Sequence, residues 1–270
     1  MSRLSCFFRR TISGVQSFRI IATPFDRNPN LLRKPTTLIA GKFGSRHFGT
    51  KPYLADAVRL TGQDKPVALY IGAASGDDRN FGSALSTLLK GAGIGKVVWP
   101  KLSKGKNKDA SVAKTALHEA DLVFVGGGDV EAGVHALRDA DLVGDLHAAA
   151  KRGTVFVGMS AGAIMLGERW IRWPREGAGD DEAETFECLG LAPCALDTHG
   201  EGDGWRETQS FAAVRARELG KKACAFGVPS GAALVIGTDG TFRARGDAVT
   251  VFAALPNRKA KIEKQLEADE

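Results

Sequence analysis

Short apolar runs alternate with segments of helical periodicity through most of the chain. The apolar runs have the length of buried strands and cover residues 37–40, 67–72, 96–99, 122–125 and 154–157. Between them, apolar side chains recur every three or four residues, which predicts helices at residues 51–60, 80–90, 111–119 and 131–151. Strands that alternate with helices form parallel sheets covered on both faces. We therefore predict an α/β fold of three layers, αβα, around a mostly parallel central sheet.

Beyond residue 160 the pattern is less regular. We expect a short strand at residues 169–173, a polar and acidic loop at 176–187, a helix at 205–219, and closing strands at 223–228, 232–236 and 248–253. No internal repeat or linker interrupts the chain, so residues 36–256 are predicted to form one domain. A basic extension, residues 1–35, precedes this domain. A charged tail, residues 257–270, follows it, and a loose helix is one interpretation of that tail.

The charge of the chain is concentrated at its beginning. Residues 1–34 hold seven basic residues and one acid, Asp26, and so carry the whole net charge of +6. The remaining domain is neutral, so we expect no nucleic-acid partner. An arginine- and serine-rich extension is typical of organelle transit peptides, but a disordered tail or an upstream start codon that is not used also explains it. We expect a cytoplasmic location, with an organelle as the alternative.

Neither a membrane span nor a metal site is indicated. No apolar run approaches the ~20 residues that a membrane helix needs, so we expect no membrane partner. The chain has four cysteines at irregular spacing, without a C-x-x-C pair, which favours reduced thiols over a zinc site or a disulfide framework. We therefore predict no metal and no organic cofactor.

A serine lies where a predicted strand turns into a predicted helix. The motif G-M-S-A-G at residues 158–162 places Ser160 between two glycines directly after the strand 154–157. Such a sharp turn needs small neighbours, and the following helix adds N–H groups beside the hydroxyl. Ser160 is therefore a candidate nucleophile. The alternative is a serine that caps a helix at a tight turn.

Three glycines and an aspartate, residues 126–129, end the strand that precedes the serine strand in sequence. Consecutive glycines allow backbone N–H groups to point outward, which suits an oxyanion that develops during a reaction. Because the two strands follow one another, we expect their ends to be neighbours. A flexible turn is the alternative. Phosphate binding is less favoured, since G-G-G-D matches neither dinucleotide-binding nor P-loop motifs.

A serine nucleophile needs a base, and His199 is the only histidine that follows Ser160 in the chain. His47 lies in an early loop and remains a second candidate, whereas the other three histidines lie in predicted amphipathic helices. A third group must orient the base. Three candidates, Glu176, Asp180 and Asp181, lie between serine and histidine, and a solvated acidic loop is the alternative for each.

These motifs together resemble the peptidase E (aspartyl dipeptidase) and cyanophycinase family of serine peptidases. The matching segments cover roughly residues 36–255 and are V-G-G-G at 125–128, G-M-S-A-G-A at 158–163, L-G-L-A-P at 189–193, D-T-H at 197–199 and G-V-P-S-G at 227–231. The resemblance implies a fold similar to class I glutamine amidotransferases (flavodoxin-like), with a serine in place of their cysteine.

The resemblance also implies roles for individual residues. It makes Ser160 the nucleophile and His199 the base, and Glu176 lies nearest to the expected position of the acid, with Asp180 in reserve. The oxyanion donors fall on the N–H groups of Gly128 and Ala161. Arg206 lies where family members bind an acidic substrate side chain. Asp129 stands where the family usually has an amide side chain, and it is a further substrate-binding candidate.

The chain also departs from the family. Ser230 stands where the family often has an acid, and the segment 200–205 carries two acids, Glu201 and Asp203. Substrate choice therefore remains open. We expect a small peptide as substrate, with aspartyl dipeptides as one candidate class, and we leave open whether the chain forms a homodimer. The alternatives are an α/β-hydrolase-type esterase and a non-catalytic binding domain that keeps the amidotransferase-like fold.

Overall fold

The computed structural model describes residues 18–19, 33–42, 46–103 and 109–269. Its largest sheet has nine strands in the order β1-β12-β11-β2-β6-β5-β3-β4, with β15 beside β12. The last five strands of this order are mutually parallel: β2 (Thr36–Ile39), β6 (Val155–Met159), β5 (Leu122–Val125), β3 (Val67–Ile71) and β4 (Lys96–Val98). Beyond β2 the sheet continues with three strands, each antiparallel to the one before it: β11 (Ala233–Ile236), β12 (Thr241–Arg245) and β1 (Phe18–Arg19). A further strand, β15 (Ala268–Asp269), pairs in parallel with β12.

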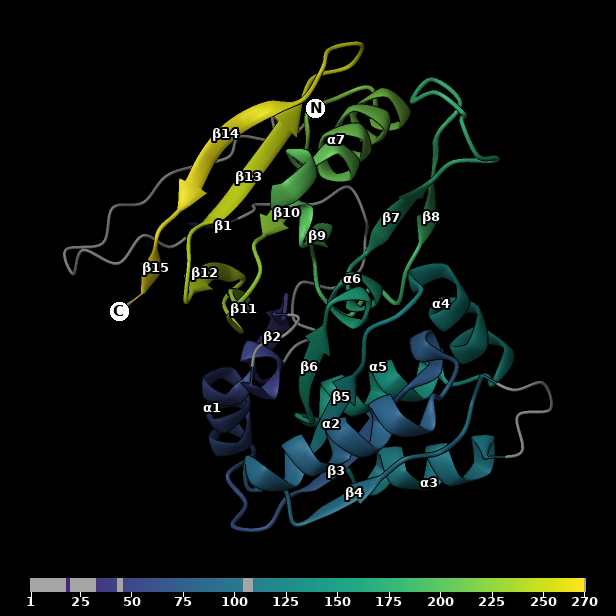
Figure 1. Cartoon of the computed structure of the whole chain (residues 1–270), viewed down its shortest axis with the longest axis vertical. Coiled ribbons are helices and arrows are strands. Elements are labelled where there is room, and N and C mark those ends of the chain that lie inside the picture. Colours follow the sequence, from purple (N-terminus) through teal and green to yellow (C-terminus); the bar gives the residue numbers. More distant parts are fainter. Residues whose placement is uncertain (1–17, 20–32, 43–45, 104–108, 270) are drawn as a thin grey trace.

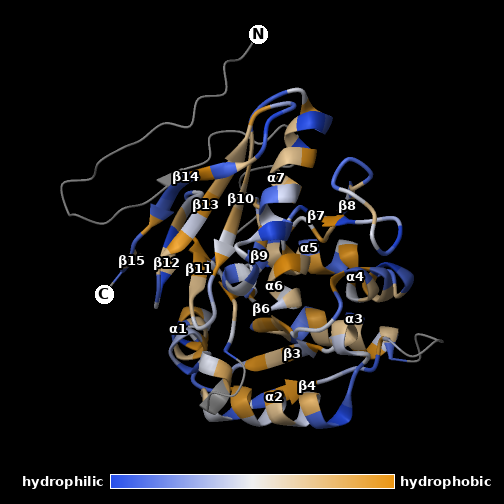
Figure 2. Cartoon of the chain, turned by 45° about the horizontal axis from the view of Figure 1, so that its top comes forward, coloured by the Kyte–Doolittle hydropathy of each residue, from blue (hydrophilic) through white to orange (hydrophobic). Residues whose placement is uncertain are grey.

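Successive side chains of a strand point to opposite faces of the sheet, so the apolar strands present hydrophobic side chains on both faces. Helices cover both faces and bury these side chains. On β3, Ala68 and Tyr70 pack in one hydrophobic cluster with the helices α1 (Lys51–Thr61) and α2 (Arg79–Gly91). Leu69 and Ile71 pack in the other cluster with four helices: α3 (Ala110–Glu119), α4 (Val130–Asp139), α5 (Val143–Arg152) and α6 (Ala161–Leu166). Figure 1 shows these layers, and Figure 2 shows hydrophobic residues concentrated on strands such as β3 and β6. The predicted αβα fold with a mostly parallel sheet is confirmed.

A second sheet lies toward the top of Figure 1, together with the helix α7 (Arg206–Leu219). Its strands, in order, are β14 (Lys261–Leu266), β13 (Val249–Ala254), β10 (Ala223–Val228) and β9 (Leu196–Thr198). The two sheets meet where the rings of Phe226 and Phe242 stack at 4.9 Å between centroids. A hairpin of β7 (Arg169–Arg172) and β8 (Glu184–Glu187) packs on α7, where Trp170 stacks on Phe211. This second layer brings the end of β9 to the central sheet.

Some predicted elements differ from the structure. The predicted helix at residues 131–151 is two helices, α4 and α5, because the chain turns at Asp141 with φ +53°. Buried residues on either side of this turn, Ala140 and Leu142, pack into the same core as both helices. The charged tail forms the strand β14 against β13 instead of a loose helix, and the acidic loop ends in β8. Among the described helices, none is long and apolar enough to cross a membrane.

Candidate active site

Ser160 lies on a strained turn between β6 and α6. Its backbone has φ +53° and ψ −126°, a combination that L-residues rarely adopt and that costs roughly 1–3 kcal/mol. Hydrogen bonds hold the turn on both sides: the Ser160 N–H donates to Ile39 O at 2.8 Å, and its carbonyl accepts from Ala163 N–H at 2.8 Å. A Cβ on Gly162 would lie 2.1 Å from Val125 O, so only glycine fits there. The G-x-S-x-G spacing is therefore a steric requirement of this turn.

The triple-glycine segment lies directly beside the serine, as the sequence predicted. A Cβ on Gly127 would lie 3.4 Å from Ser160 Oγ, and a Cβ on Gly128, which has φ +142°, would lie 2.1 Å from Ala74 O. The flanking N–H groups, those of Gly126 and Asp129, donate to Ile71 O and Ala74 O. Gly127 and Gly128 lie between these two residues, and their N–H groups form no hydrogen bond within the described part of the chain. These two amides are thus available next to the hydroxyl.

His199 follows β9 and lies in the left-handed region with φ +68°. Its side chain is half-buried, and its Nδ1 lies 2.9 Å from Ser230 Oγ. Burial lowers the pKa of the imidazole below the usual 6.5, although the Glu201 carboxylate and a hydrogen bond with the Ala40 backbone act in the opposite direction. The ring is therefore neutral near pH 7, which a general base requires.

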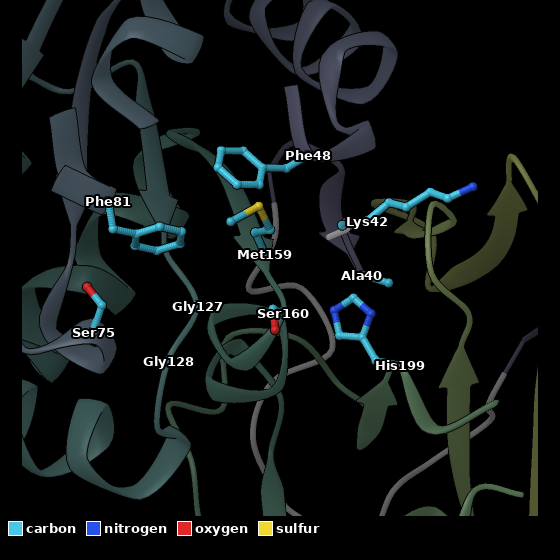
Figure 3. A pocket seen from close by; sticks show the side chains of 11 residues that line it. Ala40, Lys42, Phe48, Ser75, Phe81, Gly127, Gly128, Met159, Ser160 and His199 are labelled. Atoms are coloured by element: carbon cyan, nitrogen blue, oxygen red, sulfur yellow. The ribbon is translucent and has the colours of Figure 1, made fainter. Parts of the chain in front are cut away.

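One cavity of about 250 Å³ contains the hydroxyl, the imidazole and the glycine segment. Figure 3 shows the Ser160 hydroxyl next to the His199 ring, with the backbone of the two glycines on the other side of the serine. Apolar side chains form much of its remaining wall: Ala40, Phe48, Phe81 and Met159. Lys42 is the only charged residue among the described residues that line this cavity, and its nitrogen is directed away from Ser160 in Figure 3.

Several predicted site residues lie elsewhere. Glu176 and Asp181 are exposed on the loop between β7 and β8. Asp180, on the same loop, accepts a hydrogen bond from Ser210 Oγ at 2.7 Å and thereby ties the loop to α7. The exposed Arg206 begins α7, and neither it nor the three acids line the cavity.

Asp129 has a local structural role, since its Oδ1 caps α4 by accepting from Ala132 N–H at 2.8 Å. The side chain of His47, the second candidate base, lies outside the described part of the structure. The structure instead places Ser230 and Glu201 beside His199. The sequence had marked these two residues only as departures from the family pattern.

The two buried cysteines, Cys188 and Cys194, do not offer an alternative nucleophile. Burial raises the pKa of Cys188 to about 12 and the pKa of Cys194 well above its usual value, so both thiols stay protonated. Neither lines the cavity. Among the described residues, no group of three His, Cys, Asp or Glu side chains is placed to hold a metal ion.

A serine on a strained strand-to-helix turn, beside a neutral histidine and exposed amides, is the arrangement of an α/β serine hydrolase. The model of peptidase family S51 matches residues 41–243, which is most of the chain. The chain therefore belongs to peptidase family S51 and is a serine peptidase. The predicted resemblance to the peptidase E family is confirmed.

Solved structures of related proteins share this fold. A peptidase from an acI-B1 Actinobacterium is 18% identical, with a TM-score of 0.62, over 89% of this chain and 97% of that one. A putative peptidase E protein from Listeria monocytogenes EGD-e is 14% identical, with a TM-score of 0.52, over 82% of this chain and 98% of that one. Comparison with curated protein sequences gives no match.

Proposed function

We propose that this serine peptidase cleaves short peptides with Ser160 as nucleophile and His199 as general base. The observation that carries the proposal is the shared cavity, in which the strained serine lies between the imidazole and the amides of the glycine segment. The volume of about 250 Å³ is below the roughly 300–1,000 Å³ of pockets for drug-sized ligands. A site of this size favours a substrate of one or two residues.

In the proposed reaction, Ser160 Oγ attacks the carbonyl carbon of the scissile bond and His199 Nε2 takes the hydroxyl proton. The negative charge that develops on the carbonyl oxygen is stabilised by the N–H groups of Gly128 and Ala161. When the tetrahedral intermediate collapses, His199 gives the proton to the departing amine, and an acyl-enzyme remains. A water molecule, deprotonated by His199, then attacks the ester and releases the acid and Ser160.

Aspartyl dipeptides are the finer substrate proposal. Lys42 supports it, since a lysine at the cavity can attract a substrate carboxylate. Arg206, the cation that the sequence favoured, is exposed at the start of α7, so in our proposal it guides acidic peptides toward the site from outside. The apolar wall formed by Phe48, Phe81 and Met159 supports the competing substrates, peptides that begin with an apolar residue.

A panel of dipeptides tests both levels of this proposal. The purified chain is incubated with dipeptides that begin with aspartate, with an apolar residue or with a small neutral residue, and with p-nitrophenyl esters. We expect Ser160→Ala to lower peptide turnover by at least roughly 10³-fold. The exposed Ser83 provides the control, and Ser83→Ala should behave as the wild type. Full activity of Ser160→Ala would rule out the assigned nucleophile.

A fluorophosphonate probe separates a peptidase from a non-catalytic binding domain, because labelling requires an activated hydroxyl. We expect the wild type to be labelled at Ser160 and the His199→Ala variant to be labelled much more slowly. A wild type that is neither labelled nor active on any peptide of the panel would refute the proposed function. Turnover of esters alone would favour the esterase alternative.

We also propose that the chain works in the cytoplasm. The support is compositional: the four cysteines have neither disulfide-framework nor zinc-site spacing, which favours reduced thiols in a cytoplasmic-type compartment, whereas the arginine-rich residues 1–34 are the one segment that points to an organelle. Fusions of a fluorescent protein to the chain, with and without residues 1–34, test this in cells. Accumulation in an organelle only when residues 1–34 are present would contradict a cytoplasmic location.

A further inference from the structure

The side of His199 that faces away from Ser160 meets two polar residues from separate loops. Ser230 follows β10, and its Oγ lies 2.9 Å from His199 Nδ1. Glu201 lies in the 3-10 helix η3 (Gly200–Asp203), directly after the histidine. Its Oε1 accepts from the Ser230 N–H at 3.0 Å, and the neighbouring Ser230 side chain lowers the pKa of its carboxyl. The three residues therefore form a continuous chain of hydrogen bonds from the imidazole to a carboxylate.

We propose that Ser230 and Glu201 are the positioning residues of the histidine, acting in series where a serine peptidase usually has one acid. This inference rests on the proposed function, because it assigns roles relative to His199 as the base. Ser230 holds the ring directly, and Glu201 acts on the ring through Ser230. Neither residue lines the cavity, so neither needs to touch substrate.

The donors and acceptors of this chain fix the direction of its protons. An ionised carboxylate can only accept hydrogen bonds, and a hydroxyl has a single hydrogen to donate. In our proposal the Ser230 hydroxyl therefore donates to Glu201, and its oxygen accepts from His199 Nδ1. This requires the tautomer with the hydrogen on Nδ1, which leaves the lone pair on Nε2 for the hydroxyl proton of Ser160. The opposite direction would place the hydrogen on Nε2 and remove the base.

The ionisation of Glu201 agrees with this direction. Partial burial raises the pKa of this carboxyl. Three effects lower it: the Ser230 side chain, backbone N–H groups and the attraction of His199. Together they outweigh burial, and the pKa is lowered overall. In return, the charge of Glu201 raises the pKa of His199 and so stabilises the imidazolium that forms during the reaction. Removing this charge should therefore lower the pKa of His199 further.

Backbone hydrogen bonds hold both loops in place. The Gly231 N–H donates to Gly41 O at 2.7 Å, which ties the Ser230 loop to the cavity wall. The Trp205 N–H donates to Gly200 O at 2.7 Å and closes η3. The two strands that lead into these loops, β9 and β10, pair in register with Thr198 opposite Val228. The contact between His199 and Ser230 thus follows from the pairing of two neighbouring parallel strands.

Four variants test the proposal in the full chain. Ser230→Ala removes the hydroxyl that faces Nδ1, and we expect kcat to fall roughly 10- to 100-fold while KM stays within about 2-fold. Ser230→Thr keeps the hydroxyl and should restore kcat to within about 3-fold of the wild type. Glu201→Gln keeps an oxygen for Ser230 but loses the charge. It should lower kcat by roughly 3- to 10-fold and move the acidic limb of the kcat/KM profile to lower pH. Asp203→Asn, a neutralised acid in the same 3-10 helix, is the matched control and should change neither quantity.

Proton NMR provides a readout that does not depend on turnover. A hydrogen on Nδ1 that is bonded to Ser230 should give a resonance downfield of the amide region, and this resonance should persist in Ser160→Ala. It should be lost in Ser230→Ala and in His199→Gln. A wild type with this resonance but without peptidase activity would refute the proposed function while supporting the placement of the proton. If Ser230→Ala unfolds, the resonance and the pH profile of Glu201→Gln decide.

Two results would overturn the proposal while the proposed function stands. The first is an active wild type whose Ser230→Ala variant keeps full kcat and the same pH profile. The second is a folded Glu201→Gln variant in which the acidic limb does not move. Loss of activity in Ser230→Ala without rescue by Ser230→Thr would also count against it, since the hydroxyl would not be the functional group.

Discussion

Asp197 offers a quantitative test of the region around the histidine. It lies on β9, two residues before His199, and is only 7% exposed. Its carboxylate accepts hydrogen bonds from Thr198 N–H at 2.7 Å and from Thr208 Oγ1 at 2.9 Å. Burial raises the pKa of this carboxyl from 3.8 to about 7, and the nearby acids Glu207 and Asp203 add to the rise, while the hydrogen bonds act against it. Folding therefore favours the protonated carboxyl.

The size of the effect follows from this pKa. The rise from 3.8 to about 7 spans about three pH units, and at about 1.4 kcal/mol per unit it corresponds to at most about 4 kcal/mol. The sign is that of a raised acid: the folded state binds the proton more tightly than the unfolded state. Its contribution to the free energy of unfolding is fully present below about pH 4 and is lost as the pH rises through about 7.

Asp197→Asn should remove this dependence, because an amide of nearly the same shape can accept from Thr198 N–H and donate to Thr208 Oγ1. Urea unfolding is measured between pH 5 and pH 9. We expect the free energy of unfolding of the variant, relative to the wild type, to increase by about 2–3 kcal/mol between pH 5 and pH 8. The exposed Asp64 provides the control, and Asp64→Asn should run parallel to the wild type. Parallel curves for Asp197→Asn would refute the reasoning.

Three further predictions concern the cavity itself. Gly162→Ala should destabilise the fold and abolish turnover, since its Cβ would lie 2.1 Å from Val125 O. Gly144→Ala is the control: a Cβ there meets open space, so this variant should gain roughly 0.4–1 kcal/mol in the free energy of unfolding, measured in urea. The acidic limb of kcat/KM should lie below pH 6.5, because burial lowers the pKa of His199; a limb above that value would contradict this. Phe81→Ala should raise KM for apolar dipeptides by roughly 3- to 10-fold, with a smaller change in kcat, and an unchanged KM would exclude contact with substrate.

The parallel half of the fold was predictable because its signals are local. Each strand from β2 to β6 is a short apolar run, and the expected ends differ from the observed ones by at most two residues, as for 154–157 against Val155–Met159. The contact between the triple glycine and Ser160 also follows from topology, because β5 and β6 are neighbours with Val125 opposite Gly158. The exception is the break at Asp141, where helical periodicity continues across the turn.

The surroundings of His199 could not be predicted in the same way. Ser230 is 31 residues away in sequence, and the contact exists because β9 pairs with β10 in one particular register. A search for an acid between serine and histidine selects Glu176, but that residue lies on an exposed loop, and its role as the third member stays a prediction. The sequence did contain two differences from the family pattern that concern these residues: a serine at position 230, where the family often has an acid, and an acid at position 201.

The two halves of the site are held by different kinds of structure. The serine side is fixed by the central sheet: Ser160 N–H bonds to Ile39 O of β2, and its turn leaves no space for a side chain at Gly162. The histidine side belongs to the second sheet and to a left-handed residue followed by a 3-10 helix. The distance between hydroxyl and imidazole therefore depends on how the two sheets pack, with Phe226 on Phe242 as a direct contact between them. The base lies after β9 at the start of a 3-10 helix, and in our proposal the contact of its Nδ1 with Ser230 Oγ is what orients the ring.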